Sequence, residues 1–104
     1  MFVSTLTRTT IVTDAAEFEK RRDGLLQRLT PYLVRLPGFV SQELRRDGDA
    51  GGMTETIGWQ SEADARAYLR GGAAAMAATW LDAYFPTAPF PNGNWLRTLQ
   101  EREA

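Results

Sequence analysis

The sequence predicts a single α+β domain in which strands and helices follow one another in the order βαββαβ. Its 104 residues and 11.6 kDa suit one domain with one hydrophobic core. Stretches with apolar residues at helical spacing alternate with segments rich in β-branched residues. A run of turn-forming residues at 47–52, DGDAGG, separates two strand-like segments in the middle of the chain. This order predicts a ferredoxin-like fold, an antiparallel four-stranded sheet with the helices on one face.

The first strand and the first helix are predicted in the N-terminal third of the chain. Residues 2–12, FVSTLTRTTIV, hold no glycine or proline and are dense in β-branched side chains, which favours a strand. Asp14 is a candidate N-cap for the helix that follows. The apolar residues of this helix recur at helical spacing: Phe18, Leu25, Leu29, Leu33 and Leu36. Pro31 interrupts the pattern and is expected to kink or split the helix near residues 27–30. The Pro-Gly pair at 37–38 ends the helix.

The middle of the chain predicts a hairpin followed by a second helix. Residues 39–46 and 53–60 are the two strands, joined by the turn at 47–52. The spacing of serine and aspartate at 61 and 64 resembles a capping box, which predicts a helix over 62–70.

The last third predicts a further helix and a closing strand. Two glycines at 71–72 interrupt the helical pattern, and the alanine-rich stretch 73–84 resumes it. Three prolines then forbid regular structure: Pro86, Pro89 and Pro91. Residues 95–101 are expected to form the fourth strand, so that residues 1–104 make one domain.

The chain contains neither cysteine nor histidine. It therefore has no disulfide, no thiolate or imidazole ligand for a metal or haem, and no Ser-His or Cys-His pair. It also lacks a dinucleotide-binding or phosphate-binding motif. We expect any activity to require no metal, haem or flavin cofactor.

Charge and hydropathy exclude several classes of partner. Twelve basic and thirteen acidic residues leave a net charge of −1 with no basic stripe, so we expect no nucleic-acid binding. No apolar stretch approaches the length of a membrane span, so no membrane association is expected. Residues 1–6 lack the charged and apolar blocks of a signal peptide. We therefore expect a cytoplasmic protein.

The predicted strands carry apolar side chains on both faces of the sheet, although the helices cover only one. In the strand at 39–46, for example, Phe39 lies on one face and Val40 with Leu44 on the other. A homodimer that packs sheet against sheet would bury the face without helices. The alternative is a monomer in which the proline-rich segment covers that face.

Two short motifs lie at the junctions between helices and strands: LPGFVS at 36–41 and GWQSEA at 58–63. They resemble the antibiotic biosynthesis monooxygenase family of the dimeric α/β-barrel superfamily, and the similarity extends over about residues 7–81. The resemblance implies a dimeric α/β barrel. Families with this pattern include cofactor-free oxygenases of aromatic polyketides and haem-degrading enzymes. Because haem degradation needs a histidine ligand, this chain is not expected to perform it.

The resemblance also suggests where a substrate would bind. In the polyketide oxygenases of this family, a pocket between sheet and helices uses a tryptophan, an asparagine four residues earlier and a tyrosine six residues later. Trp59 matches the tryptophan, but the other two positions hold Glu55 and Ala65. Tyr68, one helical turn beyond Ala65, is a candidate to present a phenol to the same pocket. Trp59 is either a wall on which an aromatic substrate stacks or an anchor of the core.

Glu55 is the strongest candidate for a general base. Strand alternation places it on one face with three apolar residues: Met53, Ile57 and Trp59. Burial there would raise the pKa of the carboxyl and prepare it to take a proton from a phenol or an activated C–H bond. The alternative is a partly solvated glutamate neutralised by Arg8, Arg45 or Arg97.

Further side chains are candidates for substrate binding. Arg8 and Arg97, on the first and last strands, are suited either to hold an enolate or carboxylate oxygen or to form surface ion pairs. Ile57 shares the strand face of Glu55. The aromatic residues around the proline-rich segment form either a lid over the cavity or ordinary packing, and the candidates among them are Trp80, Phe90 and Trp95.

Three functions are compatible with these residues. The first is a cofactor-independent monooxygenase that acts on an aromatic polyketide or quinol-like molecule in secondary metabolism, in which the deprotonated substrate itself reduces dioxygen. The second is a polyketide cyclase or isomerase that uses the same base without oxygen. The third is a non-catalytic accessory protein that binds a ligand. Whether the chain is an enzyme is therefore open at this point.

Overall fold

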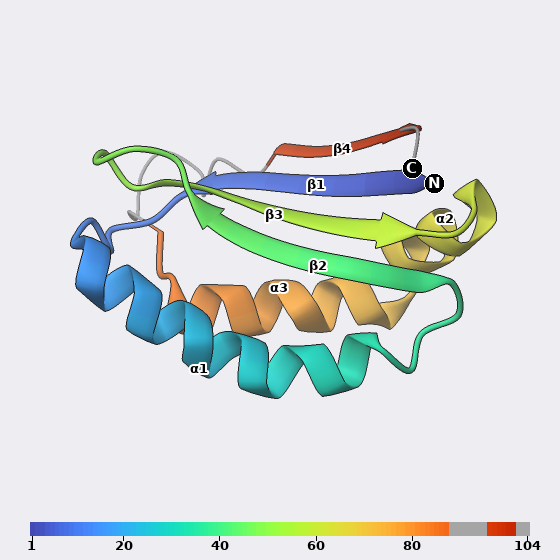
Figure 1. The fold of residues 1–104 in the computed structure, drawn as a ribbon, viewed down its shortest axis with the longest axis horizontal. Helices are drawn as coiled ribbons and strands as arrows, with labels where there is room; N and C mark the ends of the chain where they lie inside the picture. Colours follow the sequence, from blue (N-terminus) through green and yellow to red (C-terminus); the bar gives the residue numbers. More distant parts are fainter. Residues whose placement is uncertain (88–95, 102–104) are drawn as a thin grey trace.

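The computed structural model describes residues 1–87 and 96–101, with Leu96 and Arg97 described by their backbone. Within these residues an antiparallel sheet of four strands has the order β2-β3-β1-β4, and the helices lie on one side of it (Figure 1). The strands are β1 (Phe2–Thr9), β2 (Phe39–Arg46), β3 (Gly52–Trp59) and β4 (Leu96–Glu101). The helices are α1 (Ala15–Leu33), α2 (Glu62–Arg70) and α3 (Gly72–Tyr84). The predicted ferredoxin-like α+β fold is confirmed.

The pairing of β1 with β3 fixes which side chains face the helices. Trp59 lies opposite Phe2, and Glu55 lies opposite Leu6. Because side chains alternate along a strand, every second residue of β3 from Met53 to Trp59 points toward the helices. The face predicted for Glu55 from alternation is therefore correct.

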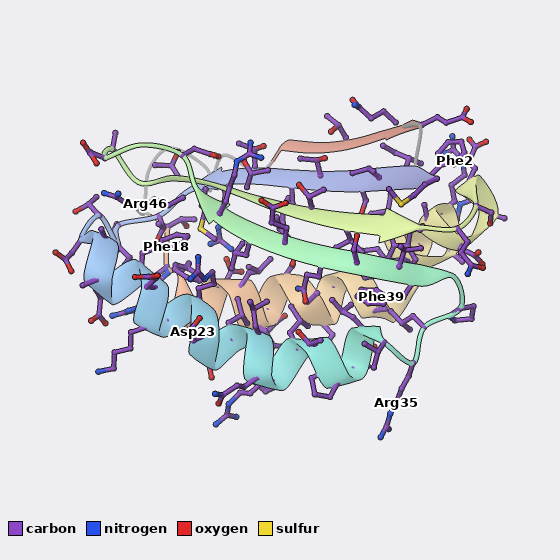
Figure 2. The ribbon with its side chains drawn as sticks, viewed as in Figure 1. Phe2, Phe18, Asp23, Arg35, Phe39 and Arg46 are labelled. Atoms are coloured by element: carbon purple, nitrogen blue, oxygen red, sulfur yellow. The ribbon has the colours of Figure 1, made fainter. Side chains whose placement is uncertain are left out.

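The core fills the space between the sheet and the helices. Helix α1 buries four of the five apolar positions expected from its spacing, which are Phe18, Leu25, Leu29 and Leu33. Leu36 lies beyond its end, because the helix stops at Leu33 rather than at the Pro-Gly pair. Helix α3 buries smaller residues, Ala74, Ala77 and Leu81, and packs against α1 and α2. In Figure 2, Phe18 points from α1 toward the sheet, whereas Arg35, just beyond the end of α1, extends away from it. Each fully buried Leu or Phe side chain contributes roughly 1.5–3 kcal/mol.

Pro31 does not split α1, which runs from Ala15 to Leu33 as one helix. The expectation of a division near residues 27–30 is wrong in this respect. Leu29 and Leu33, on either side of the proline, are both buried against the core. This packing offsets the backbone hydrogen bond that proline cannot donate.

The caps agree with the sequence, whereas the bounds of two strands, β1 and β3, differ from those predicted. Asp14 accepts a hydrogen bond from the Glu17 amide at 2.9 Å, and Ser61 accepts one from the Asp64 amide at 3.1 Å. β1 ends at Thr9 rather than at residue 12, because the Ile11 amide instead donates to the Pro86 carbonyl at 2.9 Å. β3 begins and ends one residue earlier than predicted.

The sheet face away from the helices is less apolar than expected. Val3 lies there, but its centre carries threonines from β1 and β3, namely Thr5, Thr7, Thr54 and Thr56. A bulge at Val40 shifts the register of β2 and puts Phe39 opposite Trp59, on the helix side with Leu44. The expected division of Phe39 from Leu44 is therefore wrong.

Asp47, in the turn between β2 and β3, accepts hydrogen bonds from the Thr54 hydroxyl and from Arg45, the latter at 2.7 Å. Partial burial opposes its ionisation. The two hydrogen bonds and the Arg45 charge together outweigh that effect and hold the pKa of the Asp47 carboxyl below its ordinary value.

A carboxyl with a lowered pKa in the folded state stabilises the protein above its unfolded pKa, and this contribution disappears as the pH falls through the folded pKa. We therefore expect Asp47→Asn to lower the free energy of unfolding by about 1 kcal/mol at neutral pH. The deficit should shrink as the pH falls below about 3.9. Urea unfolding at a series of pH values measures this, with the exposed Asp49→Asn as the control in the same turn. A deficit that stays constant in acid would contradict the assignment.

Among the helices of the described residues, none has both the length and the apolarity needed to cross a membrane.

Candidate functional site

Glu55 lies inside the molecule, on the helix side of the sheet. Its side chain belongs to an inner strand, and Leu6 and Leu44 lie opposite it on the two neighbouring strands. Only 5% of the residue is exposed. The amide nitrogen of Gln42 donates a hydrogen bond to Glu55 Oε2 at 3.3 Å. The predicted burial among apolar neighbours is confirmed, so Glu55 is not partly solvated. Of the three arginines named in the alternative, Arg8 does act on its charge.

Arg8 is the positive charge next to Glu55. The residue is 2% exposed, and its Nη2 donates to Asp82 Oδ1 at 2.7 Å and to the Phe85 carbonyl oxygen at 2.8 Å. Burial lowers the pKa of the Arg8 guanidinium, while the hydrogen bond that Arg8 donates to Asp82 and the charges of Asp82 and Glu55 act in the opposite direction. An arginine remains protonated under such opposing effects. The site therefore holds a buried guanidinium whose charge acts on the carboxyl of Glu55.

Trp59 is completely buried at the end of β3. Its indole Nε1 donates to the Ser4 hydroxyl at 3.1 Å. Its ring lies 4.8 Å from the Tyr68 ring in a tilted arrangement and meets Phe39 edge to face at 6.1 Å. These contacts fix the tryptophan as an anchor of the core. Tyr68 lies against Trp59, and the role of its phenol in a substrate pocket stays a prediction.

One small crevice opens onto this aromatic pair. It has a volume of about 100 Å³ and is lined by Leu36, Pro37, Trp59, Asp64, Ala67, Tyr68 and Ala73. A pocket for a drug-sized ligand typically has about 300–1,000 Å³. The crevice as it stands therefore has room for the edge of a ring system. A larger and shallower hollow of about 430 Å³ lies on the outer surface of α2, but none of its lining residues belongs to the predicted site.

Of the remaining predicted site residues, the structure places Ile57, Trp80 and the backbone of Arg97. Ile57 is buried on the same strand face as Glu55. Trp80 is half-buried on α3, and the Arg28 guanidinium lies 5.5 Å above its ring, so this tryptophan packs at the helix surface. The Arg97 backbone pairs with Leu6, which confirms that the first and last strands are neighbours. Phe90 and Trp95 lie outside the described residues, as does the proposed lid, and the Arg97 side chain also lies outside the description.

Three residues that sequence reasoning missed complete the polar surroundings of the site: Gln42, Thr30 and Asp82. Thr30 Oγ1 donates to the amide oxygen of Gln42 at 3.1 Å. Gln42 shares the strand face of Leu44, and this alternation was a usable signal. Asp82, by contrast, is more than seventy positions from Arg8 in the chain, and no local pattern connects them.

The described residues contain no group of three or more acidic, histidine or cysteine side chains arranged to hold a metal ion.

Solved structures with the same arrangement of elements identify the fold. SnoaB, described as a cofactor-independent oxygenase from Streptomyces nogalater, is 23% identical, with a TM-score of 0.61 over 99% of this chain and 94% of that one. A monooxygenase from the gene ActVA-Orf6 of Streptomyces coelicolor, solved with nanaomycin D, is 19% identical, with a TM-score of 0.67 over 99% and 88%. A structure described as an antibiotic biosynthesis monooxygenase is 11% identical, with a TM-score of 0.61 over the whole of both chains. The chain has the fold of the antibiotic biosynthesis monooxygenases.

The resemblance predicted from the motifs at 36–41 and 58–63 is thereby confirmed at the level of the fold. No family model matches the sequence, and neither does any curated protein. Glu55 and Ala65 stand at the two positions for which the resemblance implies an asparagine and a tyrosine, the residues that the polyketide oxygenases of this family use there. Ala65 is fully buried, and it is Tyr68 that reaches Trp59.

Proposed function

We propose that the protein is a cofactor-independent monooxygenase of an aromatic polyketide or quinol-like small molecule in secondary metabolism. The observation that carries this proposal is the buried carboxyl of Glu55 beside the buried guanidinium of Arg8, on the helix side of the sheet. A carboxylate that is shielded from water and a fixed positive charge are the two groups needed to remove a proton and to stabilise the anion that forms. The fold supports the proposal because a cofactor-independent oxygenase, SnoaB, and a monooxygenase, ActVA-Orf6, share it.

The proposed reaction begins with proton transfer from an activated C–H bond of the substrate to Glu55. The resulting carbanion, in resonance with a phenolate or enolate, gives its electrons to dioxygen and forms a C–O bond. The peroxide anion takes the proton back from Glu55, and the resulting hydroperoxide loses water and leaves a carbonyl group, so that a CH₂ group and O₂ become C=O and H₂O. The substrate is the reductant, and no other electron donor is needed. Arg8 stabilises the negative oxygen that develops during the first step.

The substrate is proposed to enter beside Trp59 and Tyr68, where the small crevice lies. Trp59 and Glu55 are four residues apart on one strand face, which is about 13 Å along the strand. A multi-ring molecule matches that length, and its binding requires the crevice to widen beyond 100 Å³. Tyr68 is the side chain best placed to move, because it comes from the short helix α2 and covers the Trp59 ring.

Anthrone is a suitable probe because its CH₂ group is flanked by two aromatic rings and loses a proton to a general base. With ¹⁸O₂ we expect anthraquinone carrying one ¹⁸O atom, together with consumption of one O₂ for each anthrone. Conversion of a polyketide probe without oxygen uptake would instead indicate the cyclase or isomerase. Binding of anthrone without any turnover would indicate an accessory protein and contradict the proposed monooxygenase.

We also propose that the protein is a homodimer formed through the sheet face that lacks helices. Val3 and the threonines of β1 and β3 put small side chains at the centre of that face, which is suited to packing against a second copy.

We expect a solution mass near twice 11.6 kDa at micromolar concentration. Thr56→Arg, in the middle of this face, should give the monomer because a buried charge without a partner opposes association. Sedimentation equilibrium measures the mass, and the exposed Thr79→Arg on α3 is the matched control. A wild-type monomer under these conditions would rule out the sheet-to-sheet dimer.

A further inference from the structure

A chain of hydrogen bonds runs from α1 through β2 to Glu55. The Thr30 hydroxyl donates to Gln42 Oε1 at 3.1 Å, and Gln42 Nε2 donates to Glu55 Oε2 at 3.3 Å. Thr30 and Gln42 are both half-buried, so water has limited access to these bonds. These two hydrogen bonds therefore link the carboxyl of Glu55 to the hydroxyl group of Thr30 on α1.

The direction of these hydrogen bonds follows from the chemistry of the three groups. An ionised carboxylate only accepts, so the amide group of Gln42 must turn its nitrogen toward Glu55. Its oxygen then faces Thr30, whose hydroxyl is able to donate. If the amide turned over, its oxygen would face the carboxylate oxygen and leave the hydrogen bond to Glu55 unmade. The Thr30 hydroxyl thus favours the orientation that serves Glu55.

We propose that Gln42 is the positioning residue of Glu55: it holds the carboxylate in place and favours its ionised form, and Thr30 sets the orientation of the Gln42 amide. This inference deepens the proposed function, in which Glu55 is the base. A base of this kind must be ionised before it meets the substrate, and a donor fixed on the carboxylate serves that need.

Other charges also act on the carboxyl of Glu55. Among the side chains that the structure describes, Arg8 on β1 is the positive charge coupled to it, and Asp82 on α3 is the carboxylate bonded to Arg8. Both are unchanged in variants of Gln42 and Thr30. The contribution of Gln42 is therefore separable from that of Arg8.

The test compares Gln42→Leu and Thr30→Val with the wild type. Thr30→Val keeps the side-chain shape while removing the hydroxyl, so it tests the series of hydrogen bonds even if Gln42→Leu disturbs the fold. Gln27→Leu, on an exposed position of α1, is the matched control. The protein is labelled with ¹³C at the glutamate carboxyl carbons, and the Glu55 signal is assigned by its loss in Glu55→Gln. Its titration is followed by NMR without any substrate.

In Gln42→Leu we expect the Glu55 signal to titrate about one pH unit higher than in the wild type, because the ionised form loses a hydrogen bond. Thr30→Val should shift it in the same direction by a smaller amount, and Gln27→Leu should leave it unchanged. In anthrone turnover, the acid limb of the kcat–pH profile should move by the same amount in Gln42→Leu. A merely structural role would lower stability without moving that limb.

Unchanged Glu55 titration in both Gln42→Leu and Thr30→Val, with the fold intact by near-ultraviolet circular dichroism, would overturn the proposal. A shifted titration in a protein that does not turn over anthrone would have a different meaning. It would support Gln42 as the positioning residue of Glu55 and contradict the proposed monooxygenase. The two failures are therefore distinguishable.

Discussion

Glu55→Gln is expected to lower the turnover of anthrone by roughly 10²-fold or more, the usual contribution of a positioned proton transfer. The amide has nearly the shape of the carboxylate, so the space beside Leu6 and Leu44 remains filled. It cannot accept the proton, and the carbanion that must reduce dioxygen does not form. Steady-state oxygen consumption measures the loss, and the dissociation constant for anthrone should change little.

Glu19→Gln is the matched control, since Glu19 is exposed on α1, away from both the candidate site and the proposed dimer face. Its turnover should equal that of the wild type. If Glu55→Gln also retains full turnover, Glu55 is not the base, and Tyr68 becomes the next candidate.

Arg8→Met is expected to lower the free energy of unfolding by about 3–5 kcal/mol, the range observed when one partner of a buried ion pair is removed. Two buried groups lose the interaction that Arg8 supplies. The Phe85 carbonyl oxygen loses its donor at 2.8 Å, and the Glu55 carboxyl loses the nearby positive charge. Asp82 contributes little to the loss because 54% of its side chain is exposed.

A double-mutant cycle separates these contributions. In a Glu55→Gln background, Arg8→Met should cost at least about 1 kcal/mol less than in the wild type, because no buried negative charge remains to be compensated. The control is Arg66→Met, which breaks an exposed pair with Glu62 and should cost no more than about 0.5 kcal/mol. Urea unfolding of the four proteins gives the cycle. Additive effects of the two substitutions would show that Arg8 and Glu55 are not coupled.

The parts of the fold that follow from local chemistry could be predicted from the sequence. Alternation along β3 placed Glu55 and Trp59 on one face, because a strand has a side-chain period of two. The caps Asp14 and Ser61 were predicted because each side chain bonds an amide only three residues away. Such signals need no knowledge of the rest of the chain.

The parts that depend on distant contacts could not be predicted in this way. Pro31 was expected to divide α1, but packing of Leu29 and Leu33 against the core keeps the helix continuous. The bulge at Val40 changes the face of Phe39 and leaves no local signature in the sequence. The pairing of Arg8 with Asp82 depends on where α3 crosses the sheet, which only the tertiary structure determines.

The strand order β2-β3-β1-β4 also has a consequence for how the chain assembles during synthesis. The β2–β3 hairpin pairs residues that are close in sequence, so it forms as soon as both strands leave the ribosome. β1 is made first, but its two partners are β3 and the last strand of the chain. One edge of β1 therefore waits unpaired until residues 96–101 have been synthesised. Until then, that edge is open to pairing with other chains, because its backbone amide and carbonyl groups have no partner.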